Sequence, residues 1–310
     1  MLKSLYPLRE KIPLSKAFLG IFLSTLMVSG IVWMGWLYYV HLKRMRLGDE
    51  QYRIVALAQS CPQKEGLTNT YLAQLLHLSV NQPVNLYQFD KEGGVKKLLA
   101  SPLIKSCSIK KVLPGTLFIE YQMRSPEAYL GGYENTVVDS EGYAFPYHPF
   151  FTLKSLPTIH LGASDMERTW GDSIMDDKRL VLAFEILKHV RGFFSDETST
   201  IKQVDVSHAF SESYGKRQIV VWIEERREDY QDGRKIFRVK PVFLRLNPDN
   251  YSQNLMNFMT LRNFYKGGHM SKPIQNRIFS VKETLMTMQP TIIDLRIAHL
   301  AFVKNGYNSE

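Results

Sequence analysis

Residues 17–40 read AFLGIFLSTLMVSGIVWMGWLYYV, a run of 24 positions without Lys, Arg, Asp or Glu. As an α-helix the run would span about 36 Å, and the hydrocarbon core of a bilayer is about 30 Å thick. Aromatic side chains, which favour the membrane–water interface, gather at its far end: Trp33, Trp36, Tyr38 and Tyr39. The run therefore predicts a transmembrane helix over 17–40.

Two other interpretations of this run are disfavoured. A cleaved signal peptide has an apolar region of about 7–15 residues followed by a small-residue cleavage site. No such site precedes the basic pair Lys43 and Arg44. A buried core helix is disfavoured because both faces of this run are apolar over more than six turns.

The charges flanking the run predict its orientation. Four Lys or Arg residues lie in the 1–16 tail, and three lie between 41 and 50. The positive-inside bias then places the 1–16 tail in the cytoplasm and the remainder of the chain outside the membrane.

The net charge of +9, from 39 basic and 30 acidic residues, suggests at first a nucleic-acid or membrane-surface partner. Four of those charges belong to the two flanks of the run. The remaining 260 residues hold 32 basic and 27 acidic side chains, and their densest stretch, 224–238, mixes both signs. Nucleic-acid binding favours a stripe of one sign, so we expect no nucleic-acid partner.

A small β-α-α-β-β module is predicted after the anchor. Its expected elements are a strand at 53–58, a helix capped by Thr68 or Asn69, a second helix capped by Asp90, and strands at 106–112 and 117–123. Leu117, Ile119 and Tyr121 alternate with polar or half-exposed positions, as in a half-buried strand.

Beyond Pro126 the pattern predicts short strands and two long helices. The helices are expected at 176–194, with Ser173-x-x-Asp176 as capping signal, and at 251–266, ending at Gly267-Gly268. Strands at 218–223 and 237–246 would form a hairpin around Asp232-Gly233, and 291–304 a terminal strand or pair of strands. The expected class is α+β: one transmembrane helix, the small module, and a mixed β domain with two long helices.

Several motifs resemble those of the bacterial cell-division family FtsQ/DivIB. NLYQFD at 85–90 resembles the segment that opens the second helix of a POTRA domain. SPLIKSCSIKKVLP at 101–114 with LFI at 117–119, RSPEA at 124–128, VVDSEGYAF at 137–145 and IDLR at 293–296 follow in the family's order. The motif residues are Asp90, Pro102, Pro114, Arg124 and Pro126 for the POTRA part, and Asp139, Gly142, Asp294, Leu295 and Arg296 for the β domain.

The resemblance implies domain bounds and a function. The bounds are a cytoplasmic tail at 1–16, the membrane helix at 17–40, a POTRA-like domain at 50–124, an FtsQ-type β domain at 125–304 and a polar tail at 305–310. The implied function is a bitopic inner-membrane scaffold at the division septum, with a periplasmic C-terminal domain. It would link upstream division proteins to septal peptidoglycan synthesis by binding FtsB/FtsL-like membrane-anchored coiled-coil proteins.

The expected binding site is the last strand of the β domain. Its residues are Arg296, Ile297, Ala298, His299, Leu300, Ala301, Phe302 and Val303, with odd-numbered positions from 297 on one face and even-numbered ones on the other. An open edge strand attracts another strand, whereas a fully paired strand capped by the polar tail would not. In the family a tyrosine and a turn glycine follow the D-L-R triplet; Ile297 and Leu300 stand at these positions.

Catalytic and cofactor motifs do not appear in the sequence. The eight histidines lack metal-ligand spacing, and there is no G-x-S-x-G, P-loop or G-x-G-x-x-G. We therefore expect no enzyme activity, no cofactor and no small-molecule substrate. Two alternatives remain, a POTRA-containing secretion or outer-membrane assembly component and a signal-anchored envelope enzyme, and a disulfide between Cys61 and Cys107 stays open.

Overall fold

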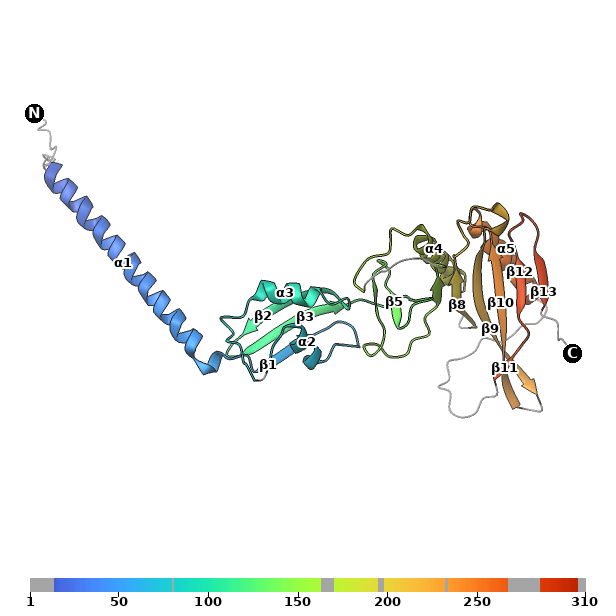
Figure 1. The fold of residues 1–310 in the computed structure, drawn as a ribbon, viewed down its shortest axis with the longest axis horizontal. Coiled ribbons are helices and arrows are strands. Elements are labelled where there is room, and N and C mark those ends of the chain that lie inside the picture. The colour runs from blue at the N-terminus through green and yellow to red at the C-terminus, as the bar shows by residue number, and fades with distance from the viewer. Residues whose placement is uncertain are drawn as a thin grey trace, which may run out of the picture. The chain divides into compact units, whose positions relative to one another are not determined.

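The computed structural model describes residues 14–79, 81–162, 170–194, 198–231, 234–266 and 285–305 (Figure 1). These residues form a long apolar helix, a small three-stranded sheet and a large mixed sheet, which confirms the predicted α+β class. The chain divides into two compact units that alternate along it. The first comprises 1–60, 69–95 and 108–119, and the second 61–68, 96–107 and 120–310.

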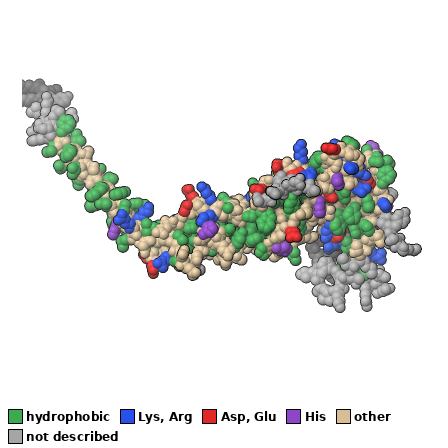
Figure 2. All heavy atoms as spheres, viewed as in Figure 1, with side chains coloured by type: hydrophobic (Ala, Val, Ile, Leu, Met, Phe, Trp, Pro, Cys, Tyr) green, Lys and Arg blue, Asp and Glu red, His purple; other side chains and the backbone are tan. Residues whose placement is uncertain are grey.

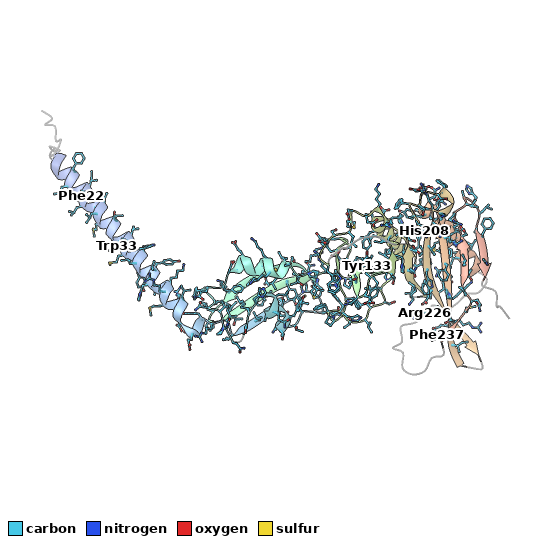
Figure 3. The ribbon with its side chains drawn as sticks, in the orientation of Figure 1. Phe22, Trp33, Tyr133, His208, Arg226 and Phe237 are labelled. Atoms are coloured by element: carbon cyan, nitrogen blue, oxygen red, sulfur yellow. The ribbon has the colours of Figure 1, made fainter. Side chains whose placement is uncertain are left out.

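The N-terminal helix α1 (Leu14–Gly48) contains the predicted 17–40 span and continues for two further turns. Within the described residues it is the one helix long and apolar enough to cross a membrane, with a mean hydropathy of 1.9 over its most apolar window. Its side chains are exposed from Phe18 to Tyr39, and Phe22 and Trp33 project from it (Figure 3). Lys and Arg side chains gather at its C-terminal end (Figure 2).

The small module has the predicted β-α-α-β-β order. Its elements are β1 (Ala56–Ser60), α2 (Asn69–Leu75), α3 (Lys91–Leu99), β2 (Ile104–Val112) and β3 (Thr116–Met123), and a short helix η1 (Glu50–Tyr52) precedes them. The strand order is β1-β3-β2. Strand β1 begins three residues later than predicted, because 53–55 pair with neighbouring loops instead: the N–H of Ile54 donates to Val84 and that of Val55 to Gly115.

The first unit has its own apolar core. Leu72, Leu86, Ile109, Leu117 and Ile119 are fully or almost fully buried, which confirms the alternation predicted for β3. Helix α3 lies close to the sheet, because a Cβ on Gly94 would come within 3.0 Å of Ile109. Asp90 caps this helix as predicted, with its carboxylate accepting from the N–H of Glu92 at 3.1 Å.

The second unit is built on the large mixed sheet. Its strands are β4 (Ala128–Leu130), β5 (Thr136–Val138), β6 (Ala144–Pro146), β7 (Thr158–His160), β8 (Ser199–Asp205), β9 (Ile219–Gln231), β10 (Arg234–Leu246), β11 (Leu285–Thr287), β12 (Thr291–Asp294) and β13 (Phe302–Asn305). Among the described residues the order is β13-β12-β10-β9-β8-β7-β4-β5-β6, and β11 also pairs with β10. The hairpin of β9 and β10 extends beyond the predicted strands, and its expected turn, Asp232-Gly233, lies outside the described residues.

The two predicted long helices are present, and they pack on one face of this sheet. They are α4 (Lys178–Phe193) and α5 (Tyr251–Lys266), with side chains such as Leu187 and Phe258 buried against Val221 and Leu244. Asp177 caps α4 by accepting from the N–H of Arg179, so the prediction of a Ser173-x-x-Asp176 capping signal was wrong. The expected stop of α5 at Gly267-Gly268 lies outside the described residues.

The C-terminal segment forms a pair of strands, one of the two predicted alternatives. β12 and β13 are antiparallel, with Asp294 opposite Phe302, and residues 295–301 connect them. The prediction of a continuous strand over Ile297–Val303 was wrong, because this stretch must reverse direction before β13. His299 takes a positive φ of 61° within this connection, a conformation that is uncommon for residues other than Gly.

Candidate functional site

Strand β13 forms one end of the large sheet. It pairs with β12 on one side, from Asp294–Phe302 to Thr291–Asn305, and has no strand partner on its other side among the described residues. The outer side of an edge strand presents backbone N–H and C=O groups that can bind another strand. The edge strand, 302–305, therefore overlaps the predicted 296–303 segment only at Phe302 and Val303.

The side chains of this edge are apolar and exposed. Phe302 is 57% exposed, and Val303, Leu300 and Ile297 are exposed as well. Val303 lies opposite Ile293, which is buried under the helices, so Val303 lies on the helix-covered face and Phe302 on the other. A strand added to β13 would thus meet an apolar side chain on each face of the sheet.

The opposite end of the sheet is closed. The outer side of β6 is covered by residues 171–174: the N–H of Ala144 donates to Asp172, and that of Gly171 donates to Ala144. Tyr143 also forms an antiparallel bridge with Ser173. The two ends therefore differ, because one is sealed by the chain itself and the other exposes apolar side chains.

Arg296 and Asp294 bind each other beside this edge. The guanidinium donates from Nη2 to Oδ2 at 2.8 Å and from Nε to Oδ1 at 3.0 Å, and the backbone N–H of Arg296 also donates to Oδ1. The guanidinium of Arg296 is therefore engaged within the chain, where it fixes the start of the connection between β12 and β13.

This pair also sets the protonation of the carboxylate. Burial by itself would raise the pKa of Asp294, but the hydrogen bonds and charge of Arg296 outweigh it and leave the pKa below its ordinary value. Arg245 adds a weaker attraction, with its Nη1 at 3.8 Å from Oδ2. Asp294 is therefore held as a carboxylate that orders the loop before β13.

Three other motif residues meet in the loop between β5 and β6. Nη1 of Arg124 lies 2.8 Å from Oδ2 of Asp139, and the guanidinium covers the ring of Tyr143 at 3.7 Å. Oδ1 of Asp139 accepts from the backbone N–H groups of Glu141 and Tyr143. Gly142 has a φ of +75°, which the turn requires. These motif residues serve the fold of the second unit, a role that sequence spacing did not indicate.

The remaining motif residues are dispersed. Asp90 caps α3, Pro102 lies next to Gly171, Pro114 is exposed in the turn before β3, and Pro126 is buried before β4. Leu295 is buried, and its N–H donates to Arg245 in β10. The structure thus does not bring the POTRA motif residues together as one site.

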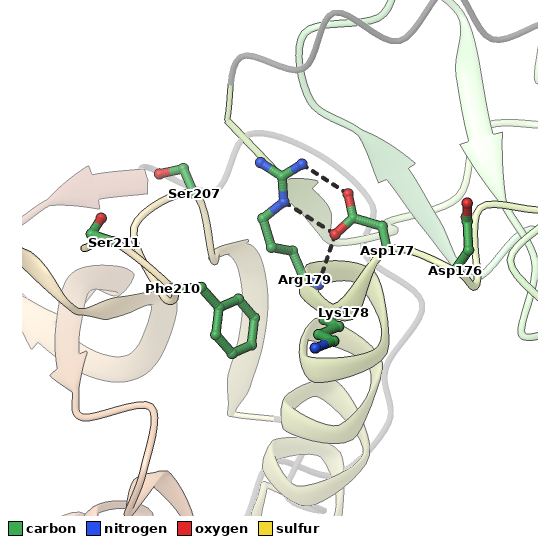
Figure 4. Close-up of a pocket in the computed structure, with 7 residues that line it drawn as sticks. All are labelled: Asp176, Asp177, Lys178, Arg179, Ser207, Phe210 and Ser211. Atoms are coloured by element: carbon green, nitrogen blue, oxygen red, sulfur yellow. Dashed lines mark hydrogen bonds and ion pairs between the residues drawn. The ribbon is translucent and has the colours of Figure 1, made fainter.

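A pocket of about 480 Å³ opens at the N-terminus of α4 (Figure 4). Three of the polar side chains around it are hydrogen-bonded within the chain: Arg179 donates to Asp177 and to the carbonyl of Leu161, and Ser207 donates to Asp205. Within the described residues, no group of three or more His, Cys, Asp or Glu side chains is placed to hold a metal ion.

Neither Cys61 nor Cys107 forms a disulfide. Sγ of Cys61 lies 3.0 Å from Oε1 of Gln63, and burial raises the pKa of the Cys107 thiol. The bridge that the sequence left open is therefore not formed in this structure.

No protein-family model matches the sequence, and no curated protein matches it at a significant level of similarity.

Proposed function

We propose that this chain is a single-span scaffold of the bacterial cell-division machinery that binds a strand of a partner at β13. Helix α1 would cross the inner membrane with the N-terminus in the cytoplasm, and both sheets would lie in the periplasm at the septum. The partners would be FtsB/FtsL-like anchored coiled-coil proteins. Through them the chain would connect upstream division proteins to the synthases of septal peptidoglycan.

The observation that carries this proposal is the contrast between the two ends of the large sheet. β6 is sealed by residues 171–174, whereas β13 exposes its outer backbone and two apolar side chains. Natural sheets usually protect long exposed edges, so an apolar edge that is left open is suited to strand addition. The order of the family-like motifs and the membrane-spanning length of α1 support the cell-division setting.

Co-purification with FtsB/FtsL-like chains tests the proposal. We expect Phe302→Lys to weaken recovery strongly, because the charge would have to be buried against the added strand. Truncation after Arg296, which removes β13, should abolish recovery. Unchanged recovery with both variants would exclude strand addition at this edge.

Phe210→Lys is the matched control. Phe210 is 53% exposed, close to the exposure of Phe302, but lies in the loop after β8. Both substitutions replace an exposed phenylalanine by lysine in the second unit. A general effect of lost surface hydrophobicity would therefore reduce recovery equally, whereas binding at β13 predicts a loss for Phe302→Lys alone.

A further inference from the structure

Three exposed apolar residues of the first unit lie at or beside the turn between β2 and β3. Val55 is 83% exposed and Leu113 is 62% exposed, and Val112 is exposed beside it. The N–H of Val55 donates to the carbonyl of Gly115 at 2.9 Å, which brings Val55 to the turn that contains Leu113. We refer to Val55, Val112 and Leu113 as the turn patch.

Contacts within the first unit hold this turn against the end of α1. Nδ2 of Asn85 donates to the carbonyls of Arg46 and Leu47 at 3.0 and 3.1 Å and so caps the last turn of the helix. The guanidinium of Arg46 lies 5.7 Å above the ring of Tyr87. Gly115 packs so closely on the chain after α1 that a Cβ would lie 2.1 Å from the carbonyl oxygen of Arg53.

The length of α1 places this end near the lipid headgroups. The apolar run ends at Val40, and Gly48 follows about 12 Å further along the helix, at about 1.5 Å per residue. The run itself is about 6 Å longer than a hydrocarbon core of about 30 Å, and the headgroup region adds about 5–8 Å on each side. Along the helix axis Gly48 therefore lies about 4–7 Å beyond the headgroups when the run fills the core, and tilt of the helix lowers this height.

The charges around the turn patch favour an anionic lipid surface. Basic residues exceed acidic ones on the segments 41–55 and 110–113 by six to two: Lys43, Arg44, Arg46, Arg53, Lys110 and Lys111 against Asp49 and Glu50. Basic residues next to a membrane span are attracted to anionic lipids, and adjoining apolar side chains insert at the interface.

We propose that the turn patch contacts the surface of an anionic bilayer beside α1, with Val55, Val112 and Leu113 inserted among the headgroups. This contact limits the rotation of the small module about the helix axis and fixes which of its faces points away from the membrane. The inference rests on the proposed membrane span of α1.

Depth-dependent fluorescence quenching in nanodiscs tests the contact. A genetically encoded, environment-sensitive fluorescent amino acid is placed at Leu113 of the full chain, in discs that contain phosphatidylglycerol and a headgroup-nitroxide lipid. We expect a blue-shifted emission and strong quenching at this position. The same probe at Leu153, an exposed leucine of the second unit, is the control and should be quenched little. Equal quenching at the two positions would overturn the proposal.

A third position separates this inference from the membrane span itself. The probe at Val28, in the middle of the apolar run, should be quenched by a nitroxide on the acyl chain. Loss of that signal would contradict the span and the proposed function with it. Quenching at Val28 without quenching at Leu113 would exclude the turn patch alone. In discs of neutral phosphatidylcholine, quenching at Leu113 should fall, and an unchanged value would exclude the role of the basic residues.

Discussion

Arg124 and Asp139 form a buried ion pair that joins the end of β3 to the loop between β5 and β6. Their nearest atoms are 2.8 Å apart, and their side chains are 11% and 6% exposed. Asp139 also accepts two backbone hydrogen bonds from its own loop, and Arg124 covers the ring of Tyr143. The carboxylate of Asp139 therefore orders the loop between β5 and β6 and also anchors this loop to the end of β3.

Asp139→Ala should destabilise the second unit strongly. It removes the nearer and more buried carboxylate beside Arg124, leaving only the exposed Glu141 at 3.6 Å, and it leaves two N–H groups without acceptors. We therefore expect a loss of about 3–5 kcal/mol in the free energy of unfolding. Urea unfolding of the full chain in detergent measures this. Glu127→Ala, which breaks the more exposed pair with Arg191, should cost at most about 1 kcal/mol. Similar losses of stability for both variants would contradict the claim that the more buried ion pair contributes more to stability.

Two glycines of the second unit should respond oppositely to alanine. Gly142→Ala should destabilise by about 1–2 kcal/mol or more, because its φ is +75° and a Cβ would lie 2.5 Å from Cγ of Met175. Gly192→Ala should stabilise by about 0.4–1 kcal/mol, since it lies in α4 with open space around it. Thermal unfolding of the two variants under one condition checks both signs. A stabilising effect of Gly142→Ala would contradict the turn geometry.

The hydrogen-bonded pair of Arg296 and Asp294 should make stability depend on pH in acid. The pKa of Asp294 is lower in the folded state than its ordinary value of 3.8. Its contribution is therefore complete above pH about 3.8 and is lost as the pH falls through the lower, folded-state pKa. We expect the stability difference between wild type and Asp294→Asn to shrink below pH about 3.8, as measured by melting temperatures from pH 7 to pH 2.

Arg296→Met provides the control for this dependence. In that background the Asp294→Asn substitution should have a much smaller pH-dependent effect, because the main group that lowers the pKa of Asp294 is gone. An equally large effect in the two backgrounds would assign the pKa shift to another group.

The sequence predicted those elements whose signals are local. The apolar run of 17–40, the cap at Asp90, the alternation of Leu117 and Ile119, and the two long helices all depend on neighbouring residues, and the structure confirms them. The short strands β4 to β7 have three residues each, too few for a periodic pattern. The pairing of β4 with β7 and of β7 with β8 also joins segments far apart in the sequence.

Candidate site residues were also harder to predict, because their roles depend on contacts with other parts of the chain. The segment 297–303 is apolar enough to read as one strand, but the antiparallel return onto β12 requires a connection there, and only 302–305 form the strand. The pairing of Arg124 with Asp139 joins residues 15 positions apart. Nothing in their spacing distinguishes such a structural ion pair from a binding motif.

Site-specific photo-crosslinking from β13 tests the central claim most directly. p-Benzoyl-phenylalanine in place of Phe302 retains an aromatic side chain at the exposed edge, and in place of Phe210 it reports a matched exposed position outside it. In dividing bacterial cells that express FtsB/FtsL-like chains, we predict a crosslinked product with such a chain from position 302 and little or none from position 210. A full-length, membrane-inserted protein that gives no product from position 302, or equal products from both positions, would contradict partner binding at this edge.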